Sequence, residues 1–265
     1  MSAAGATLRV ARDGPVVRVT LSRPEVRNAF NAELIGDLHD AFTALAGEPS
    51  ATLRAVVLAG EGPAFCAGAD VAWMRASLAL SVEDNEADAR RMAEMLDLVD
   101  ACPVPVIARV HGAALGGGMG LCAVADVALA AADTVFGFTE ARLGILPAVI
   151  SPFVLVRIGE GQARALFPTG ERFDAERALR IGLVHEVLAD SVALDARVDA
   201  VVADLLAAGP TAARAAKAVI RDQRGLDWAM TRSLTVGAIA RQRVSPEGQE
   251  GLTAFLEKRP PSWQE

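Results

Sequence analysis

The chain has 265 residues, of which 52% are hydrophobic and 22% are charged, and its formal net charge at pH 7 is −7. This composition supplies ample material for a hydrophobic core and excludes an intrinsically disordered chain. The acidic balance argues against nucleic acid as a partner, because such proteins carry a basic surface.

The N-terminus and the cysteines indicate a protein of a reducing compartment. The first 14 residues lack the apolar core of a secretory signal. The longest uncharged apolar stretch, 112–125, is glycine-rich and shorter than the ~20 residues that span a bilayer. Three cysteines without metal-ligand spacing predict small buried thiols, Cys66 included. We therefore expect a cytoplasmic protein without a membrane partner, and the scattered histidines give no metal site.

The N-terminal part alternates strand and helix patterns. Asp13-Gly14 separates segments 8–12 and 15–22, whose alternating side chains predict a hairpin. Asn31 can cap a helix that ends near Gly47. The apolar positions of this helix recur at helical spacing: Leu34, Ile35, Leu38, Phe42 and Leu45. A buried strand at 54–60 follows and leads into the loop Phe-Cys-Ala-Gly-Ala-Asp at 65–70.

A charged helical segment and a second strand come next. Residues 73–101 have helical character and many charges between Glu83 and Arg91, which favours a solvated helix face over a functional role. Residues 104–110 predict a buried strand that leads to His111, for which we expect a hydrogen-bonded loop position rather than a catalytic one.

Three consecutive glycines, Gly116 to Gly118, then precede an apolar segment at 119–125. Glycines admit a ligand close to the backbone, and the N–H groups of a helix N-terminus can hold a phosphate or an oxyanion. A P-loop is excluded because no Lys-Ser or Lys-Thr follows. The looser dinucleotide pattern, Gly118, Gly120 and Ala123, is a weak match. An oxyanion hole needs a second N–H donor, which the 65–70 loop can supply.

The remaining chain predicts a strand at 127–130, a helix capped by Asp174, and an extended segment at 183–188. From Ser191 it predicts helices at 191–208, 211–223, 226–243 and 246–257. This alternation is typical of an α/β fold built from stacked ββα units. We divide the chain into a core domain, 1–190, and a C-terminal helical layer, 191–265.

Ordered motifs along most of the chain carry a family resemblance. They are Leu-Ser-Arg-Pro at 21–24, Asn28-Ala29, the 65–70 loop, His-Gly-Ala-Ala-Leu-Gly-Gly-Gly at 111–118, Glu-Ala-Arg-Leu-Gly-Ile-Leu-Pro at 140–147 and Phe-Leu-Glu-Lys-Arg at 255–259. Together they resemble the crotonase (enoyl-CoA hydratase/isomerase) superfamily. The resemblance implies the crotonase spiral, a C-terminal trimerisation layer, a homo-trimer or hexamer, and an acyl-CoA thioester substrate. No separate cofactor is implied, because coenzyme A is part of the substrate.

The resemblance also implies roles for individual residues. The N–H groups of Ala69 and Gly117 would form the oxyanion hole, and Glu140 would be the catalytic carboxylate. The residues implied in substrate binding are Val26, Ala67, Gly68, Asp70, Gly116, Phe255 and Lys258. Of these, Phe255 and Lys258 would approach the coenzyme A of a neighbouring subunit, although Lys258 could equally be an ordinary surface lysine. Without the motif, Glu140 would be interpreted as a surface carboxylate paired with Arg142.

Two departures from the best-known hydratases bear on the substrate. Those enzymes carry a second glutamate where this chain has Gly120, and their Pro-Gly-x-Gly-Gly loop is replaced here by residues 146–154. The variant resembles the branch that hydrates 3-methylglutaconyl-CoA or isohexenylglutaconyl-CoA, and we expect a hydratase for such a branched substrate. Arg75, Arg91 and Arg142 are candidates for its distal carboxylate. A Δ3,Δ2-enoyl-CoA isomerase and a non-catalytic acyl-CoA-binding paralogue stay open as alternatives.

Overall fold

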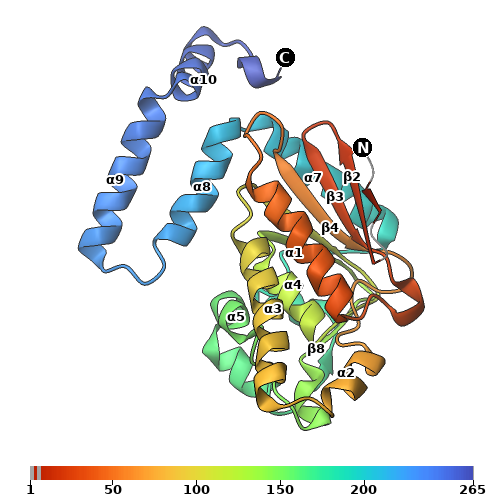
Figure 1. Cartoon of the computed structure of the whole chain (residues 1–265). Coiled ribbons are helices and arrows are strands. Elements are labelled where there is room, and N and C mark those ends of the chain that lie inside the picture. Colours follow the sequence, from red (N-terminus) through yellow and green to blue (C-terminus); the bar gives the residue numbers. More distant parts are fainter. Residues whose placement is uncertain (1–2, 5–6, 265) are drawn as a thin grey trace.

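The computed structural model describes residues 3–4 and 7–264, and its main sheet has seven strands in the order β1-β2-β3-β4-β5-β7-β10 (Figure 1). The strands are β1 (Ala3–Ala4), β2 (Leu8–Asp13), β3 (Val16–Leu21), β4 (Ala55–Gly60), β5 (Val106–Val110), β7 (Val127–Ala131) and β10 (Glu186–Leu188). The first three pair antiparallel, and the pairing is parallel from β3 to β10. The hairpin predicted at Asp13-Gly14 is confirmed.

A second, three-stranded sheet consists of β6 (Ala113–Leu115), β8 (Val135–Gly137) and β9 (Arg172–Phe173). Two isolated bridges extend it: Cys66 pairs with Ala114, and Phe30 pairs with Ala69. The 65–70 loop is therefore held between Phe30 on one side and β6 on the other. This arrangement positions the candidate site.

The helices that surround the sheets are α1 (Ala32–Ala46), α2 (Val71–Ser77), α3 (Val82–Asp100), α4 (Gly117–Val124), α5 (Ser151–Leu166), α6 (Ala175–Arg180), α7 (Ser191–Ala207), α8 (Pro210–Asp222), α9 (Trp228–Val244) and α10 (Pro246–Glu257), with short 3-10 turns η1 (Pro24–Val26), η2 (Thr139–Leu143) and η3 (Ser262–Gln264). The Asn31 side chain caps α1 by accepting from the Leu34 N–H at 2.9 Å, and the five predicted apolar positions are its buried residues. The last four helices lie close to their predicted ranges.

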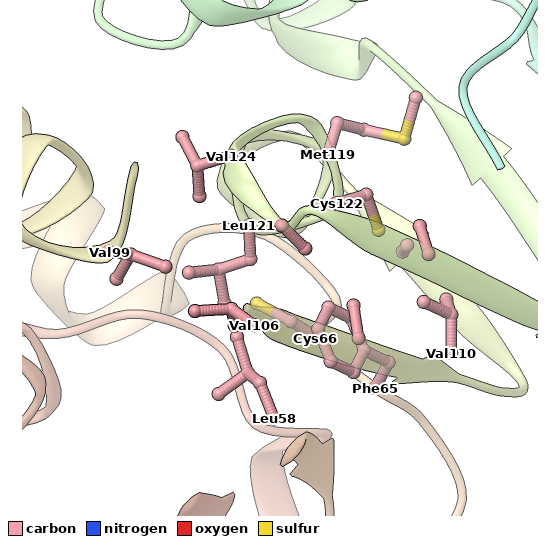
Figure 2. Packing of buried hydrophobic residues seen from close by; sticks show 14 of the residues in the cluster. Leu58, Phe65, Cys66, Val99, Val106, Val110, Met119, Leu121, Cys122 and Val124 are labelled. Atoms are coloured by element: carbon pink, nitrogen blue, oxygen red, sulfur yellow. The ribbon is translucent and has the colours of Figure 1, made fainter. Parts of the chain in front are cut away.

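Both faces of the main sheet are covered. Val56 and Leu58 of β4 face the larger core with α1, α3 and α4, whereas Ala55 and Val57 face a smaller core with Leu194, Val198 and Val201 of α7. Burial on both faces explains the continuous apolar run of β4, because successive side chains of a strand point to opposite faces. Figure 2 shows part of the larger core, in which Leu121 and Cys122 of α4 meet Val106, Leu58 and Phe65.

The C-terminal helices separate from the sheet after α7. Figure 1 shows α8, α9 and α10 as an arm, with α9 far from the sheet. Polar contacts join α8 to the core: Arg214 donates to the Glu48 carbonyl at 2.8 Å, and Lys217 to Asp126 at 2.6 Å. The boundary at residues 190 and 191 stays a prediction, and α7 lies on the sheet rather than in the arm.

Two segments differ from the expected elements. The helix expected at 73–101 is two helices, because Ser81 starts a new one by accepting from the Asp84 N–H at 3.1 Å. Helix α5 was not predicted, since Pro152 in its first turn and Gly159 within it are residues typical of loops. No helix of the described residues is long and apolar enough to cross a membrane.

Candidate active site

Main-chain pairing orients the first oxyanion donor. The Ala67 N–H donates to the Arg27 carbonyl at 3.0 Å, the Phe30 N–H to the Gly68 carbonyl at 2.7 Å, and the Asp70 N–H to the Phe30 carbonyl at 2.8 Å. Because the N–H groups of an extended chain alternate in direction, the Ala69 N–H points away from Phe30. It has no hydrogen-bond acceptor among residues 3–4 and 7–264.

Arg23 and Asp70 hold this loop from outside. Arg23 donates to Asp70 at 2.8 Å and to the Ala29 carbonyl at 2.6 Å. Asp70 also caps α2 by accepting from the Ala72 N–H at 2.7 Å. The hydrogen bond from Arg23 is the main reason that the pKa of Asp70 lies below its ordinary value. Asp70 is therefore ionised and engaged, and it supports the loop rather than offering a free carboxylate.

The glycine turn places the second donor beside the first loop. Gly116 adopts a φ of +50°, in the region that favours glycine, and its N–H donates to the Gly137 carbonyl at 2.9 Å. A Cβ at Gly116 would lie 3.6 Å from the Gly68 Cα, so the two loops are in contact. Gly117 begins α4, and its N–H has no acceptor in the described part of the chain. Both proposed donors are thus unpaired.

Glu140 lies beside the glycine turn, in the first turn of η2. Its Oε1 is 3.4 Å from the position of a Cβ at Gly116, and its Oε2 is buried without a hydrogen-bond partner among the described residues. Burial raises the pKa of Glu140 above its ordinary value. Arg142 donates to the Thr169 carbonyl at 3.2 Å, and no salt bridge joins it to Glu140 in the described structure. A buried, unpaired carboxylate next to two unpaired N–H groups is suited to moving a proton beside a developing oxyanion.

The family model described as "Enoyl-CoA hydratase/isomerase" matches residues 11–265. The chain belongs to the enoyl-CoA hydratase/isomerase family. This confirms the predicted superfamily and an enzyme with enoyl-CoA hydratase/isomerase activity on acyl-CoA thioesters.

Individual members of this family are similar to the chain in sequence and in fold. The chain is 34% identical to a crotonyl-CoA hydratase of Syntrophomonas wolfei subsp. wolfei, over 90% of each chain. Among solved structures, Pseudomonas aeruginosa AtuE is 39% identical with a TM-score of 0.94 and covers 98% of this chain and 100% of its own. An enoyl-CoA hydratase of Shewanella pealeana ATCC 700345 is 36% identical, with a TM-score of 0.91 and coverage of 97% and 96%. The predicted α/β crotonase fold is confirmed.

Apolar side chains pack against α4 at Gly117 and Gly120. A Cβ at Gly117 would lie 2.7 Å from the Phe30 ring and 2.8 Å from the Met92 methyl carbon. A Cβ at Gly120 would lie 2.5 Å from Ile150 Cγ2. Phe30 and Met92 were not predicted here, because each comes from an element distant in the chain. Ile150 belongs to the apolar 146–154 segment, whose departure from the family pattern the sequence already linked to the substrate.

A cleft of about 510 Å³ lies beside the 65–70 loop. It is lined by four of the predicted substrate-binding or catalytic residues, Val26, Ala67, Ala69 and Asp70, together with Arg75. Its volume falls in the range of small-molecule sites. The cleft thus reaches Ala69, one of the two proposed donors.

The structure separates two predicted residues from this site. Phe255, with 81% of its surface exposed, and Lys258 lie at the end of α10, which Figure 1 places far from α2 and β8. Their approach to a neighbouring subunit's coenzyme A stays a prediction. Among the arginine candidates, Arg91 is paired with Asp88, whereas Arg75 has neither an ion pair nor a side-chain hydrogen bond among the described residues.

Other side chains near the two loops have structural roles. His111 bridges Arg109 at 3.0 Å and the Gly62 carbonyl at 2.8 Å, which fits a hydrogen-bonded loop histidine. Burial raises the pKa of the Cys66 and Cys122 thiols to about 12, so neither is a reactive thiolate near neutral pH. All three cysteines are free and buried, as the sequence predicted.

Proposed function

We propose that this enzyme is a hydratase that adds water across the α,β-double bond of an acyl-CoA thioester, with Glu140 as its single acid–base group. The observation that carries the proposal is the buried Oε2 of Glu140 beside the N–H groups of Ala69 and Gly117, none of which has a hydrogen-bond partner in the part of the chain that the structure describes. An unpaired buried carboxylate is costly, and such a cost is typical of a functional position.

The reaction then needs one proton and one base. Glu140 takes a proton from water while the oxygen of that water bonds to C3 of the substrate. The electrons of the double bond move to the thioester oxygen, where the Ala69 and Gly117 N–H groups stabilise the resulting enolate. Glu140 returns the proton to C2, and the enolate collapses to the hydrated thioester. Because one carboxylate both activates the water and returns the proton, the hydroxyl and the hydrogen reach the same face of the double bond. We therefore expect syn addition.

The finer part of the proposal concerns the substrate, a branched glutaconyl-type ester such as 3-methylglutaconyl-CoA or isohexenylglutaconyl-CoA. Its support is the apolar segment Val149-Ile150 in place of a glycine-rich loop, together with the absence of a side chain at Gly120. The distal carboxylate of such a substrate needs a cation. Arg75 is the candidate that we favour, because it lines the cleft beside Ala69 and is not engaged elsewhere in the described structure.

A second candidate activity is Δ3,Δ2-enoyl-CoA isomerisation. It is favoured by the surroundings of Gly120, where Ile150 and Leu96 stand in place of a second acid–base group. One carboxylate is sufficient to move a proton from C2 to C4. A non-catalytic acyl-CoA-binding role is disfavoured by the unpaired Glu140, since binding alone gives no reason to bury a carboxylate without a partner.

One experiment separates these activities. The purified enzyme is incubated with crotonyl-CoA, 3-methylglutaconyl-CoA and a 3-enoyl-CoA, and the absorbance of the conjugated thioester is followed. Loss of absorbance with either 2-enoyl ester supports hydration, and a higher kcat/KM on the branched ester supports the finer proposal. Gain of absorbance with the 3-enoyl ester, without hydration, supports isomerisation. No change with any ester contradicts both activities.

We further propose that the working form is a homo-trimer or a dimer of trimers. Its support is the arm α8–α10, in which α8 and α9 have no buried residue and many apolar side chains are exposed. In such an assembly Phe255 and Lys258 would reach the coenzyme A of the neighbouring subunit, with the Lys258 ammonium against a phosphate.

A further inference from the structure

One face of α4 has no side chain at two positions one turn apart, Gly117 and Gly120. Residues three apart lie on the same face of a helix, so both glycines lie on one face of α4. Phe30 and Met92 occupy the space beside Gly117, and Ile150 and Leu96 the space beside Gly120. These apolar side chains therefore form a wall that follows this face of α4 from the proposed donor Gly117 to Ile150.

The contact between Gly120 and Ile150 leaves no room for another side chain. A Cβ at Gly120 would lie 2.5 Å from Ile150 Cγ2 and 3.3 Å from Ile150 Cβ, and real Cβ contacts essentially never fall under 3.0 Å. Leu96 Cδ1 would lie 3.5 Å away, at ordinary contact distance. Ile150 is thus the side chain that occupies this space, and Leu96 only adjoins it.

Ile150 cannot easily turn aside. Only 2% of its surface is exposed, and its carbonyl accepts from the Val154 N–H at 3.1 Å in the first turn of α5. Ser151 fixes the preceding turn, because its hydroxyl donates to the Ala148 carbonyl at 2.7 Å and its N–H at 3.1 Å. A β-branched side chain has few rotamers. Met92, by contrast, is unbranched and flexible, so it can adapt to different acyl groups.

We propose that Ile150 is the specificity-determining residue of this enzyme: it closes the acyl pocket beside Gly120 and, by the same contact, prevents any side chain at position 120. The proposal rests on the proposed function, because an acyl group whose thioester oxygen is held at Gly117 extends along this wall. Pocket length is accordingly set by the first turn of α5 rather than by α4. A shorter side chain at position 150 lengthens the pocket and admits longer acyl groups.

The first test measures chain-length preference. We compare wild type and Ile150→Ala on straight-chain 2-enoyl-CoA esters of increasing length, starting with crotonyl-CoA, and expect the ratio of kcat/KM for long over short esters to rise about tenfold. The matched control is Ile158→Ala, which removes the same atoms from a buried position of α5 farther from Gly120 and should leave the ratio unchanged. An Ile150→Ala ratio within about twofold of wild type overturns the proposal.

The second test measures the contact between Gly120 and Ile150 through thermal stability, without an activity assay. Alanine favours a helix more than glycine does, so Gly120→Ala would raise Tm if the space were free. We expect Gly120→Ala to lower Tm in wild type and to lower it less in the Ile150→Ala background, as a double-mutant cycle would show. A rise of Tm in wild type overturns the proposal. If the proposed function is wrong, the result differs. Wild type then hydrates none of the esters, while the double-mutant cycle still shows the contact between positions 120 and 150.

Discussion

The carboxylate of Glu140 and the backbone of Gly116 are separated by the space of a single missing side chain. A Cβ at Gly116 would lie 3.4 Å from Oε1 and 3.7 Å from Cδ of Glu140. Gly116 also precedes Gly117, whose N–H is a proposed oxyanion donor. A thioester that enters between the loops can therefore reach the base and the donor together, and any L residue at 116 would be strained by the φ of +50°.

Glu140→Gln should abolish turnover and preserve binding. General acid–base catalysis contributes about 10²–10⁴-fold, so we expect at most about a hundredth of the wild-type rate. Affinity for a CoA ester should be nearly unchanged, because the proposed binding contacts are backbone N–H groups and apolar walls. Steady-state kinetics and calorimetry measure the two quantities. A higher residual rate would mean that the base lies elsewhere, for example on the exposed Glu83–Asp88 segment of α3.

The pH–rate profile should report the buried carboxylate. Glu140 must be ionised to accept a proton from water, and burial raises its pKa. The acidic limb of kcat/KM in wild type is therefore expected at a higher pH than an ordinary glutamate would give. The trace activity of Glu140→Gln should lack this limb. A limb that persists in the variant would assign the essential ionisation to another group.

The same pKa shift predicts a pH-dependent stability difference. A folded-state pKa above the unfolded value means that the stabilisation is present below the unfolded pKa and is lost as pH rises through the folded one. Glu140→Gln removes this loss, so its Tm should exceed that of wild type at pH 8, and the difference should shrink towards pH 4. Glu160→Gln is the control, because the Glu160 side chain is 75% exposed. Equal Tm values at pH 8 would contradict the prediction.

Gly117→Pro and Gly117→Ala together isolate the oxyanion donor. Both add a Cβ that meets Phe30 and Met92, but only proline removes the N–H. Proline is tolerated at the first position of a helix, so the difference between the variants reflects the donor. We expect Gly117→Pro to be about 10²–10³-fold slower than Gly117→Ala. Comparable rates in two folded variants, with folding checked by circular dichroism, would exclude Gly117 as a donor.

Arg75→Gln should affect one substrate more than another. If the Arg75 guanidinium holds the distal carboxylate, kcat/KM for 3-methylglutaconyl-CoA should fall roughly tenfold or more while the value for crotonyl-CoA is kept. Arg91→Gln is the control, since Arg91 is exposed and paired with Asp88. Equal losses on both esters would show that Arg75 binds the coenzyme A portion instead.

Local signals explain what could be predicted from the sequence. Three predicted features depend only on neighbouring residues: the Asn31 cap, the Asp13-Gly14 turn, and the glycine and proline breaks of the last four helices. The structure contains all three. The closeness of Gly116 to both Glu140 and Gly68 follows only from the family motif, because no local pattern joins these residues.

Tertiary contacts explain what could not be predicted. Ile150 fills the space at Gly120 from 30 residues farther along the chain, and periodicity gives no sign of such a contact. Met92 reaches Gly117 from the charged helix α3, whose composition indicated only a solvated face. Glu140 likewise lacks a partner among the described residues because Arg142 donates to the Thr169 carbonyl instead, whereas the sequence alone favoured a pair between them.

The arm α8–α10 should associate with other copies of this chain. Trp228, Val236 and Ile239 of α9 are 79%, 60% and 50% exposed, and a monomer rarely leaves such apolar side chains in water. We expect sedimentation at micromolar concentration to give a trimer or hexamer for wild type. Ile239→Glu should shift the population towards monomer and raise KM, because Phe255 and Lys258 would no longer reach a neighbouring coenzyme A. Leu179→Glu is the control, since Leu179 is exposed on α6, outside the arm. A stable wild-type monomer would refute the assembly, whereas a dissociated Ile239→Glu variant with unchanged KM would refute only the shared site.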